Sequence, residues 1–160
     1  MDYYILIIIF LGIFLFVVAH FVFIAIKKGI INKKVEKLAE GVSEMTPQEF
    51  FKMRNYSFGG RGRHKYALSK NFAGVYILYN KTKNKYYVGQ ATRILDRVNN
   101  HFTGKGNGDV YADYKYGDYF TIKMISLENS GFYSLNELER ATISKYNAFS
   151  RGYNKTRGNR

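Results

Sequence analysis

The chain has no cysteine, one proline and three histidines among its 160 residues. Without cysteine it can form neither a disulfide nor a thiolate metal site. Three histidines far apart in the sequence also argue against structural zinc. Acidic residues are scarce, 12 against 25 lysines and arginines. The lack of cysteine is compatible with a reducing cytosol but does not require it.

The basic excess is large and lies outside the N-terminal segment. The net charge is +13, and since Asp2 is the only charged residue up to Ile26, the rest of the chain carries +14. A small domain stays soluble with a net charge of roughly 2–8. The excess therefore indicates attraction to a polyanion, either nucleic acid or an anionic lipid surface.

The N-terminal segment is an almost unbroken apolar run from Tyr3 to Ile26. At about 1.5 Å per residue, a helix of this length crosses a hydrocarbon core of roughly 30 Å. The charged start and the cleavage site of a secretory signal peptide are both missing. Lysines follow at once, at positions 27, 28, 33 and 34. The positive-inside rule then predicts a single-pass anchor over residues 1–26 with the C-terminal domain in the cytoplasm.

Residues 27–71 are expected to form juxtamembrane helices and a basic linker. A weak apolar stripe predicts a charged helix over Asn32–Met45. The sequence Thr-Pro-Gln-Glu at positions 46–49 predicts the start of another helix, because it combines a capping box with proline in the first turn. The glycine-rich stretch that follows holds Arg61 and Arg63, which either follow a phosphate backbone or belong to an ordinary solvated loop.

Two strand-like runs, residues 74–80 and 85–91, flank a short polar turn. Pairing the ends of the runs places Tyr76 opposite Gly89 and puts Tyr87 on the same face, one diagonal step away. The missing side chain of Gly89 would leave a gap where a phosphate approaches. Two tyrosines that merely pack a sheet would give the same pattern.

A helix is predicted next, from Thr92 to Phe102. Arg93, Arg97 and His101 recur at four-residue spacing and so share one face of it. Arg97 is a planar donor suited to bidentate phosphate contact. His101 is suited to donate to a phosphate oxygen or to relay a proton. A solvated basic face is the alternative interpretation.

A later helix begins at Ser134, which can cap it, while Glu137 completes the capping box and so has a structural role. Glu139 instead falls on a largely apolar, inward-facing stripe. A carboxylate there is costly unless it is paired or bound to a metal. Glu139 is therefore the metal-ligand candidate, and a salt bridge to an arginine is the alternative.

Together these elements resemble the GIY-YIG nuclease family. The matching positions are, in chain order, Gly74-Val75-Tyr76, Tyr87-Val88-Gly89, Arg97, His101, Glu139 and Gly152-Tyr153-Asn154. Valine stands at both places where the family motif has its central isoleucine. The spacing from Glu139 to Asn154 is similar to that of the homing-endonuclease branch. The resemblance covers roughly residues 72–156.

The resemblance implies an α/β (α+β) domain over residues 72–160, in which a mostly antiparallel three-stranded sheet is flanked by helices. Residues 120–127 are the expected third strand. It also implies metal-dependent phosphodiester hydrolysis. One carboxylate makes a sparse site, which suits Mg²⁺, or Mn²⁺ in its place, because Mg²⁺ keeps several waters.

The expected roles follow from that chemistry. Glu139 holds the metal, and Arg97 stabilises the pentacovalent phosphate. Tyr76, assisted by Tyr87, positions or deprotonates the attacking water, and His101 accepts or relays the proton. Asn154 supports the site or hydrogen-bonds the substrate.

Further basic side chains are assigned to nucleic acid, namely Arg93, Arg61, Arg63, Lys105 and Lys155. The expected substrate is DNA, and a nuclease at the inner face of a membrane would meet phage or plasmid DNA as it enters the cell. Two alternatives stay open. One is a catalytically inactive, membrane-tethered nucleic-acid-binding protein, and the other is a structural membrane protein whose basic domain binds anionic lipid.

Overall fold

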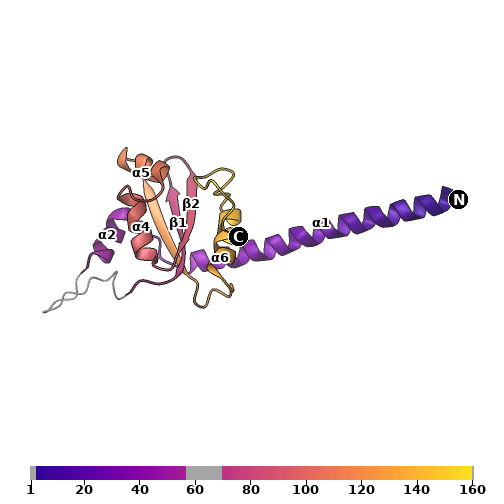
Figure 1. Cartoon of the computed structure of the whole chain (residues 1–160), viewed down its shortest axis with the longest axis horizontal. Helices are drawn as coiled ribbons and strands as arrows, with labels where there is room; N and C mark the ends of the chain where they lie inside the picture. Colours follow the sequence, from indigo (N-terminus) through magenta and orange to yellow (C-terminus); the bar gives the residue numbers. More distant parts are fainter. Residues whose placement is uncertain (1–2, 57–69, 160) are drawn as a thin grey trace. The chain divides into compact units, whose positions relative to one another are not determined.

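The computed structural model describes residues 3–56 and 70–159. The chain divides into two compact units, Met1–Lys34 and Val35–Arg160. In chain order the elements are α1 (Tyr3–Glu40), α2 (Pro47–Arg54), β1 (Gly74–Asn80), β2 (Lys85–Ala91), α4 (Ile94–Phe102), α5 (Gly108–Lys115), β3 (Phe120–Ser126) and α6 (Leu135–Lys145) (Figure 1).

The sheet has the strand order β2-β1-β3 with both pairings antiparallel, so the predicted three-stranded α+β architecture is confirmed. The predicted hairpin register is also confirmed. Tyr76 lies opposite Gly89, and Tyr87 lies opposite Leu78. The central strand, β1, carries Tyr76, and β2 is an edge strand.

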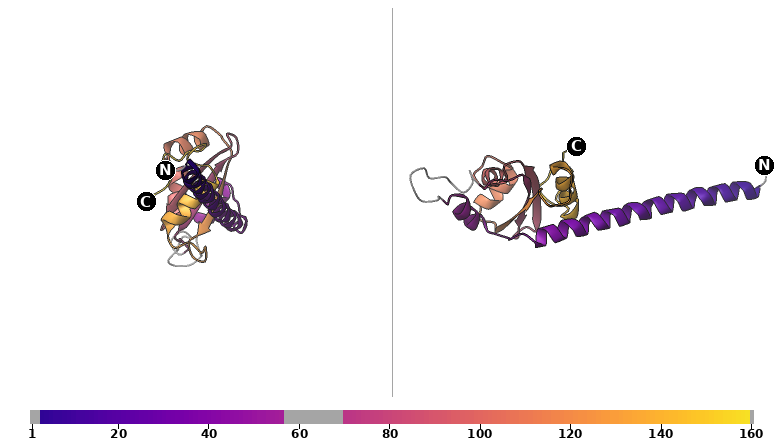
Figure 2. Two further views of the ribbon diagram at one scale, coloured as in Figure 1. Left: turned by 90° about the vertical axis from the view of Figure 1, so that its right-hand side faces the viewer. Right: turned by 90° about the horizontal axis from the view of Figure 1, so that it is seen from below.

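The two faces of the sheet are covered by different helices, as the views in Figures 1 and 2 show. Tyr76 and Leu78 belong to an apolar core shared with α2, α4 and α5. Val75 and Ile77 alternate to the other face and pack with α6 and with Ala39 of α1. Alternation along β1 thus sends one tyrosine of the motif into the layer formed by α4.

The first helix differs from the prediction. Instead of an anchor over residues 1–26 followed by a separate helix over Asn32–Met45, a single helix runs from Tyr3 to Glu40. It stops before Gly41, and Met45 pairs with Ile122 of β3 through two backbone hydrogen bonds of 2.8 and 3.1 Å. The predicted helix over Asn32–Met45 therefore stops at Glu40, and Met45 pairs with the sheet instead.

In α1, the side chains from Ile7 to Ile30 are exposed, and most of them are apolar. Among the described residues, α1 is the one helix long and apolar enough to cross a membrane, a criterion of length and composition. Its last turn, in the second unit, is different because Val35 and Ala39 are buried there. The helix thus ends as part of the core of the second unit.

Two short helices lie beside the sheet in the second unit. The predicted capping box of α2 is confirmed, since Thr46 and Glu49 exchange hydrogen bonds of 2.7 and 3.3 Å. Arg61 and Arg63 lie outside the described residues. Helix α5 was not predicted, and the side chain of Asn107 caps it by accepting from the backbone N–H of Val110 at 3.0 Å.

Candidate active site

The edge of β2 is closed by the segment that follows α6. The backbone N–H of Tyr153 donates to the carbonyl of Tyr86 at 2.9 Å. The side-chain amide of Asn154 pairs with both backbone groups of Val88, accepting at 2.9 Å and donating at 2.7 Å. The amide thus replaces the strand residue that an edge would otherwise lack. Of the two roles predicted for Asn154, this geometry favours support of the site.

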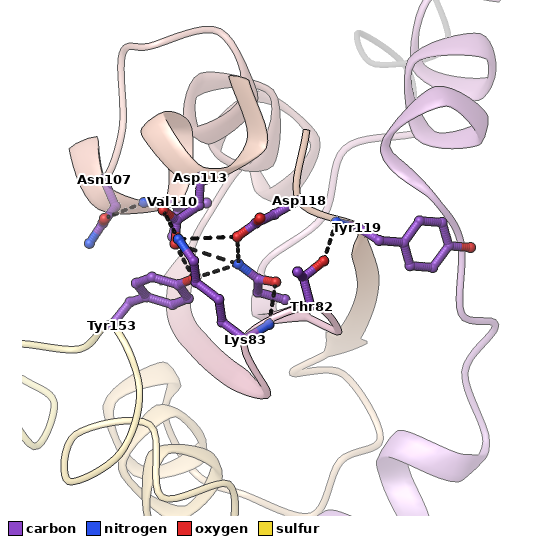
Figure 3. Close-up of polar contacts among 9 residues, drawn as sticks. Thr82, Lys83, Asn107, Val110, Asp113, Asp118, Tyr119 and Tyr153 are labelled. Carbon is purple, nitrogen blue, oxygen red and sulfur yellow. Dashed lines mark hydrogen bonds and ion pairs between the residues drawn. The ribbon is translucent and has the colours of Figure 1, made fainter. Parts of the chain in front are cut away.

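A second set of contacts anchors the same segment (Figure 3). The hydroxyl of Tyr153 donates to Asp113 at 2.6 Å and accepts from the amide of Asn80 at 2.7 Å. The same amide also donates to Asp118 at 2.7 Å, and Lys83 forms ion pairs with both carboxylates. Because Asn80 is fully buried, this network ties the C-terminal segment to the turn between β1 and β2.

A polar cavity of about 350 Å³ lies between this segment and the sheet. Its lining includes Tyr76, Tyr87, Arg97, Glu139 and Asn154. These side chains come from β1, β2, α4, α6 and the C-terminal segment, and they are up to 78 positions apart in the chain. The structure thus brings together the tyrosines, the arginine and the carboxylate that the spacing singled out.

Gly89 makes room for a protein side chain. A Cβ atom at this position would overlap the hydroxyl group and ring of Tyr76. The space beside Gly89 is therefore occupied by Tyr76 itself. Gly89 also lines the cavity, and approach of a phosphate there stays a prediction. Glycine is needed there because the ring lies across the neighbouring strand.

His101 lies behind Tyr76 in the core and is fully buried, so the alternative of a solvated basic face does not hold for this residue. Its Nε2 is 2.8 Å from the hydroxyl oxygen of Tyr76. Its Nδ1 accepts the backbone N–H of Asn107 at 2.9 Å. Since Nδ1 must supply a lone pair to that N–H, a neutral ring carries its proton on Nε2 and donates it to Tyr76.

The electrostatics keep this pair neutral. Burial, with a smaller effect from Arg97, lowers the pKa of His101 to about 4. Burial and the neighbouring Tyr87 raise the pKa of Tyr76 above its ordinary value. At pH 7 Tyr76 therefore keeps its proton. Because Nε2 already holds a hydrogen, His101 is placed to orient Tyr76 and not to accept a proton from it, and its position behind Tyr76 also prevents direct contact with a phosphate.

Tyr87 and Arg97 complete this side of the cavity. The ring of Tyr87 lies 6.1 Å from that of Tyr76 and 4.9 Å from that of His101. Burial raises the pKa of Tyr87, and Arg97 partly offsets this rise. Arg97 is itself solvent-exposed, so its guanidinium group is accessible to a phosphate entering the cavity.

Glu139 lies on the other side and is only 7% exposed. Its Oε2 accepts from the side-chain nitrogen of Gln90 at 3.1 Å and from the backbone N–H of Asn159 at 3.2 Å. Within residues 3–56 and 70–159 it forms no ion pair, so the alternative of a salt bridge with arginine is not found. A carboxylate this buried, without a cationic partner, fits a site for a divalent cation.

The donor set also bears on the kind of cation. No group of three or more His, Cys, Asp or Glu side chains is assembled anywhere in the described part of the chain. A single carboxylate in a polar cavity suits Mg²⁺, which keeps several waters and takes substrate oxygens as its other ligands.

A protein-family model described as the GIY-YIG catalytic domain matches residues 72–154. The chain belongs to the GIY-YIG family. Comparisons with curated proteins and with solved structures give no match. The family makes the chain a nuclease, an enzyme that cleaves phosphodiester bonds in nucleic acid. The cavity between α4 and α6 is the candidate active site of this GIY-YIG domain.

The remaining basic candidates lie differently around the GIY-YIG cavity. Lys155 lines it and is highly exposed, with Asp109 at 3.6 Å. Arg93 pairs with Asp96 at 2.8 Å, and Lys105 is exposed. Neither of these two side chains lines the cavity, so the structure groups only Lys155 with the catalytic candidates.

Three residues at the site escaped the sequence analysis, namely Gln90, Asn107 and Asn159. Gln90 directly follows the Tyr-Val-Gly motif, and that position was the available signal. The other two act through backbone N–H groups, which every residue except proline carries, so residue type offered no indication.

Proposed function

We propose that this GIY-YIG protein is a membrane-anchored, Mg²⁺-dependent endonuclease that cleaves DNA at the inner face of a membrane. The observation that carries the proposal is the convergence of Tyr76, Arg97 and Glu139, from three separate elements, on one polar cavity. The periodicity of a single helix or strand can bring together only residues of that element. It therefore does not explain why these three side chains line the same cavity.

In this proposal Glu139 holds the cation, and waters and phosphate oxygens complete its coordination. Mn²⁺ has the same preference for oxygen ligands and is expected to replace Mg²⁺. When bound, the cation stabilises the charge that develops on the phosphate and on the leaving oxygen. Side chains of the protein orient the substrate phosphate and the attacking water next to the cation.

Arg97 binds the phosphate oxygens opposite the carboxylate and stabilises the added negative charge of the pentacovalent phosphate. Tyr76 accepts the Nε2 hydrogen of His101, and its hydroxyl group also interacts with the side chains of Arg97 and Tyr87. In this proposal Tyr76 positions the attacking water while it stays protonated, and Tyr87 supports it from the next strand.

The apolar N-terminal helix and the lysines after it support a location of the catalytic domain at the inner face of a membrane. Helix α1 is long and apolar enough to span a bilayer, and the lysines that follow position 26 favour a cytoplasmic catalytic domain. A cytoplasmic nuclease at the membrane would meet foreign DNA on entry. Cleavage of incoming phage or plasmid DNA is therefore the proposed biological activity.

The central experiment is a paired cleavage assay. The full chain in lipid nanodiscs is incubated with duplex DNA, single-stranded DNA or RNA, with Mg²⁺ or with EDTA. Glu139→Ala is compared with Glu128→Ala, which removes an exposed carboxylate. Mg²⁺-dependent cutting by the wild type and by Glu128→Ala, but not by Glu139→Ala, is expected.

The same assay separates the alternatives. Equal cutting by the wild type and by Glu139→Ala would remove the mechanism. DNA binding without cutting would identify an inactive nucleic-acid-binding protein. Binding to anionic liposomes with no affinity for nucleic acid would identify the lipid-binding alternative.

The anchor is tested in cells. Deletion of Met1–Ile26 should abolish protection of cells against phage or plasmid entry. The purified deletion variant should still cut DNA in vitro. Protection that survives the deletion would show that the tether is not needed.

A further inference from the structure

Gln90, at the end of β2, spans two side chains of α6. Its side-chain nitrogen donates to Oδ1 of Asn136 at 2.6 Å and to Oε2 of Glu139 at 3.1 Å. Asn136 and Glu139 are three residues apart and so lie on the same side of the helix. Gln90 is half-buried and lines the cavity.

The orientation of the Gln90 amide follows from its partners. An ionised carboxylate can only accept hydrogen bonds, so the end of the amide that faces Glu139 must be the nitrogen. Both hydrogens of that nitrogen are then used, one on each acceptor. The remaining polar atom of the side chain is the carbonyl oxygen, which can only accept hydrogen bonds.

The carboxylate is held from a second direction. The backbone N–H of Asn159 donates to the same oxygen, Oε2, at 3.2 Å. Two donors on Oε2 occupy its two lone pairs. Among the described residues no hydrogen bond reaches Oε1, so this oxygen is the one that remains for a cation.

We propose that Gln90 is a positioning residue for the metal site: by holding Oε2 of Glu139 it would leave Oε1 as the oxygen that holds the cation. The inference rests on the proposed role of Glu139 as metal ligand. Side chains that hydrogen-bond to a ligating carboxylate fix its orientation, and their loss typically weakens metal binding by about 10–100-fold.

The test measures metal binding directly. Mn²⁺ affinity of the full chain in nanodiscs is determined by electron paramagnetic resonance for the wild type, Gln90→Leu and Gln48→Leu. Gln48 is exposed on α2 and provides the matched control. Gln90→Leu is expected to bind Mn²⁺ about 10–100-fold more weakly, with duplex DNA affinity in EDTA unchanged.

A second variant guards against a folding defect. Gln90→Met keeps the length of the side chain but has no N–H group, and it should weaken Mn²⁺ binding to a similar extent. Cooperative thermal unfolding close to that of the wild type identifies which variants are folded. A folded Gln90→Leu or Gln90→Met that binds Mn²⁺ as the wild type does would overturn the assignment.

The wild type and Glu139→Ala separate the two possible failures. If the wild type binds no Mn²⁺, or Glu139→Ala binds it equally well, the metal role of Glu139 itself is wrong, and with it the role of Gln90. If Glu139→Ala loses Mn²⁺ while both Gln90 variants retain it, only the role of Gln90 fails.

Discussion

The two sides of the candidate catalytic cavity differ in charge. On one side, Tyr76 and His101 are buried and neutral, and their mutual orientation depends on which nitrogen carries a hydrogen. On the other side, Glu139 is buried, has no cationic partner within the part of the chain that the structure describes, and accepts two N–H groups on Oε2. The first side orients a hydroxyl group, whereas the second holds a negative charge that a cation can neutralise. Substitutions on the two sides should therefore separate rate from metal affinity.

The largest effect is expected from Glu139→Gln. The variant keeps the shape of the side chain but removes the charge that holds the cation, so cleavage should fall by roughly 10³-fold or more. Mn²⁺ binding should be lost in parallel. Single-turnover cleavage and direct metal titration measure the two effects. Retained Mn²⁺ affinity would show that the carboxylate charge is not what the site requires.

Tyr76→Phe should act on rate alone. It removes the hydroxyl group that His101 orients, and loss of a group that manages the attacking water typically costs about 10²–10⁴-fold. Mn²⁺ affinity should not change, in contrast to Glu139→Gln. Tyr79→Phe is the matched control, because Tyr79 projects from the opposite face of the sheet, where it stacks on Tyr86. Equal loss in both variants would argue for a general folding effect.

Gly106→Ala should displace His101, because the added methyl group would lie against its Nδ1 atom. A Cβ atom there would lie 2.5 Å from Nδ1 of His101, so the loop must move and the hydrogen bond from Asn107 must lengthen. Overpacking of this kind lowers the free energy of unfolding by about 1–3 kcal/mol. Nitrogen NMR of His101 should show a mixture of tautomers. Gly108→Ala is the control, since a Cβ atom at Gly108 meets nothing within 4 Å.

The low pKa of His101, about 4, makes the fold sensitive to acid. In the unfolded chain a histidine has a pKa near 6.5, so between pH 6.5 and 4 the unfolded state binds the additional proton. Stability should therefore fall as pH falls, and His101 should account for a loss of about 2 kcal/mol between pH 7 and pH 5. Urea unfolding of the wild type and of His101→Gln at both pH values measures the difference. The same pH slope in both proteins would contradict this assignment.

The smallest effect is expected from Gly158→Ala. Gly158 has a φ of +103°, and a Cβ atom there would lie 2.7 Å from Cγ of Arg140. The substitution should shift the N–H of Asn159 away from Glu139 and weaken Mn²⁺ binding by less than the 10–100-fold expected of a side-chain partner. Gly117→Ala has a similar φ of +98° without a nearby atom. A larger loss of Mn²⁺ affinity in Gly117→Ala would show that the contact at Glu139 is not responsible.

The sequence by itself determined the parts of the protein that depend on near neighbours in the chain. The register of the hairpin, the capping box at Thr46 and the helix that begins after Ser134 all follow from side-chain period and from capping hydrogen bonds within a few residues. The membrane-length apolar run is read directly from composition, and the order of the catalytic candidates was recognised through the resemblance to the GIY-YIG family. The register and the caps could be predicted because the physical forces behind them act between residues that are close in the sequence.

Only the tertiary structure decided what surrounds the catalytic candidates. The four-residue spacing placed His101 on one helix face with two arginines, but only packing against β1 shows that it is buried, and the Asn107 N–H selects its tautomer. Gln90 and Asn159 meet Glu139 from positions 49 and 20 residues away. Burial and hydrogen bonds across such separations depend on how the sheet and helices pack. The charge and proton positions of the active site therefore arise only once the chain has folded.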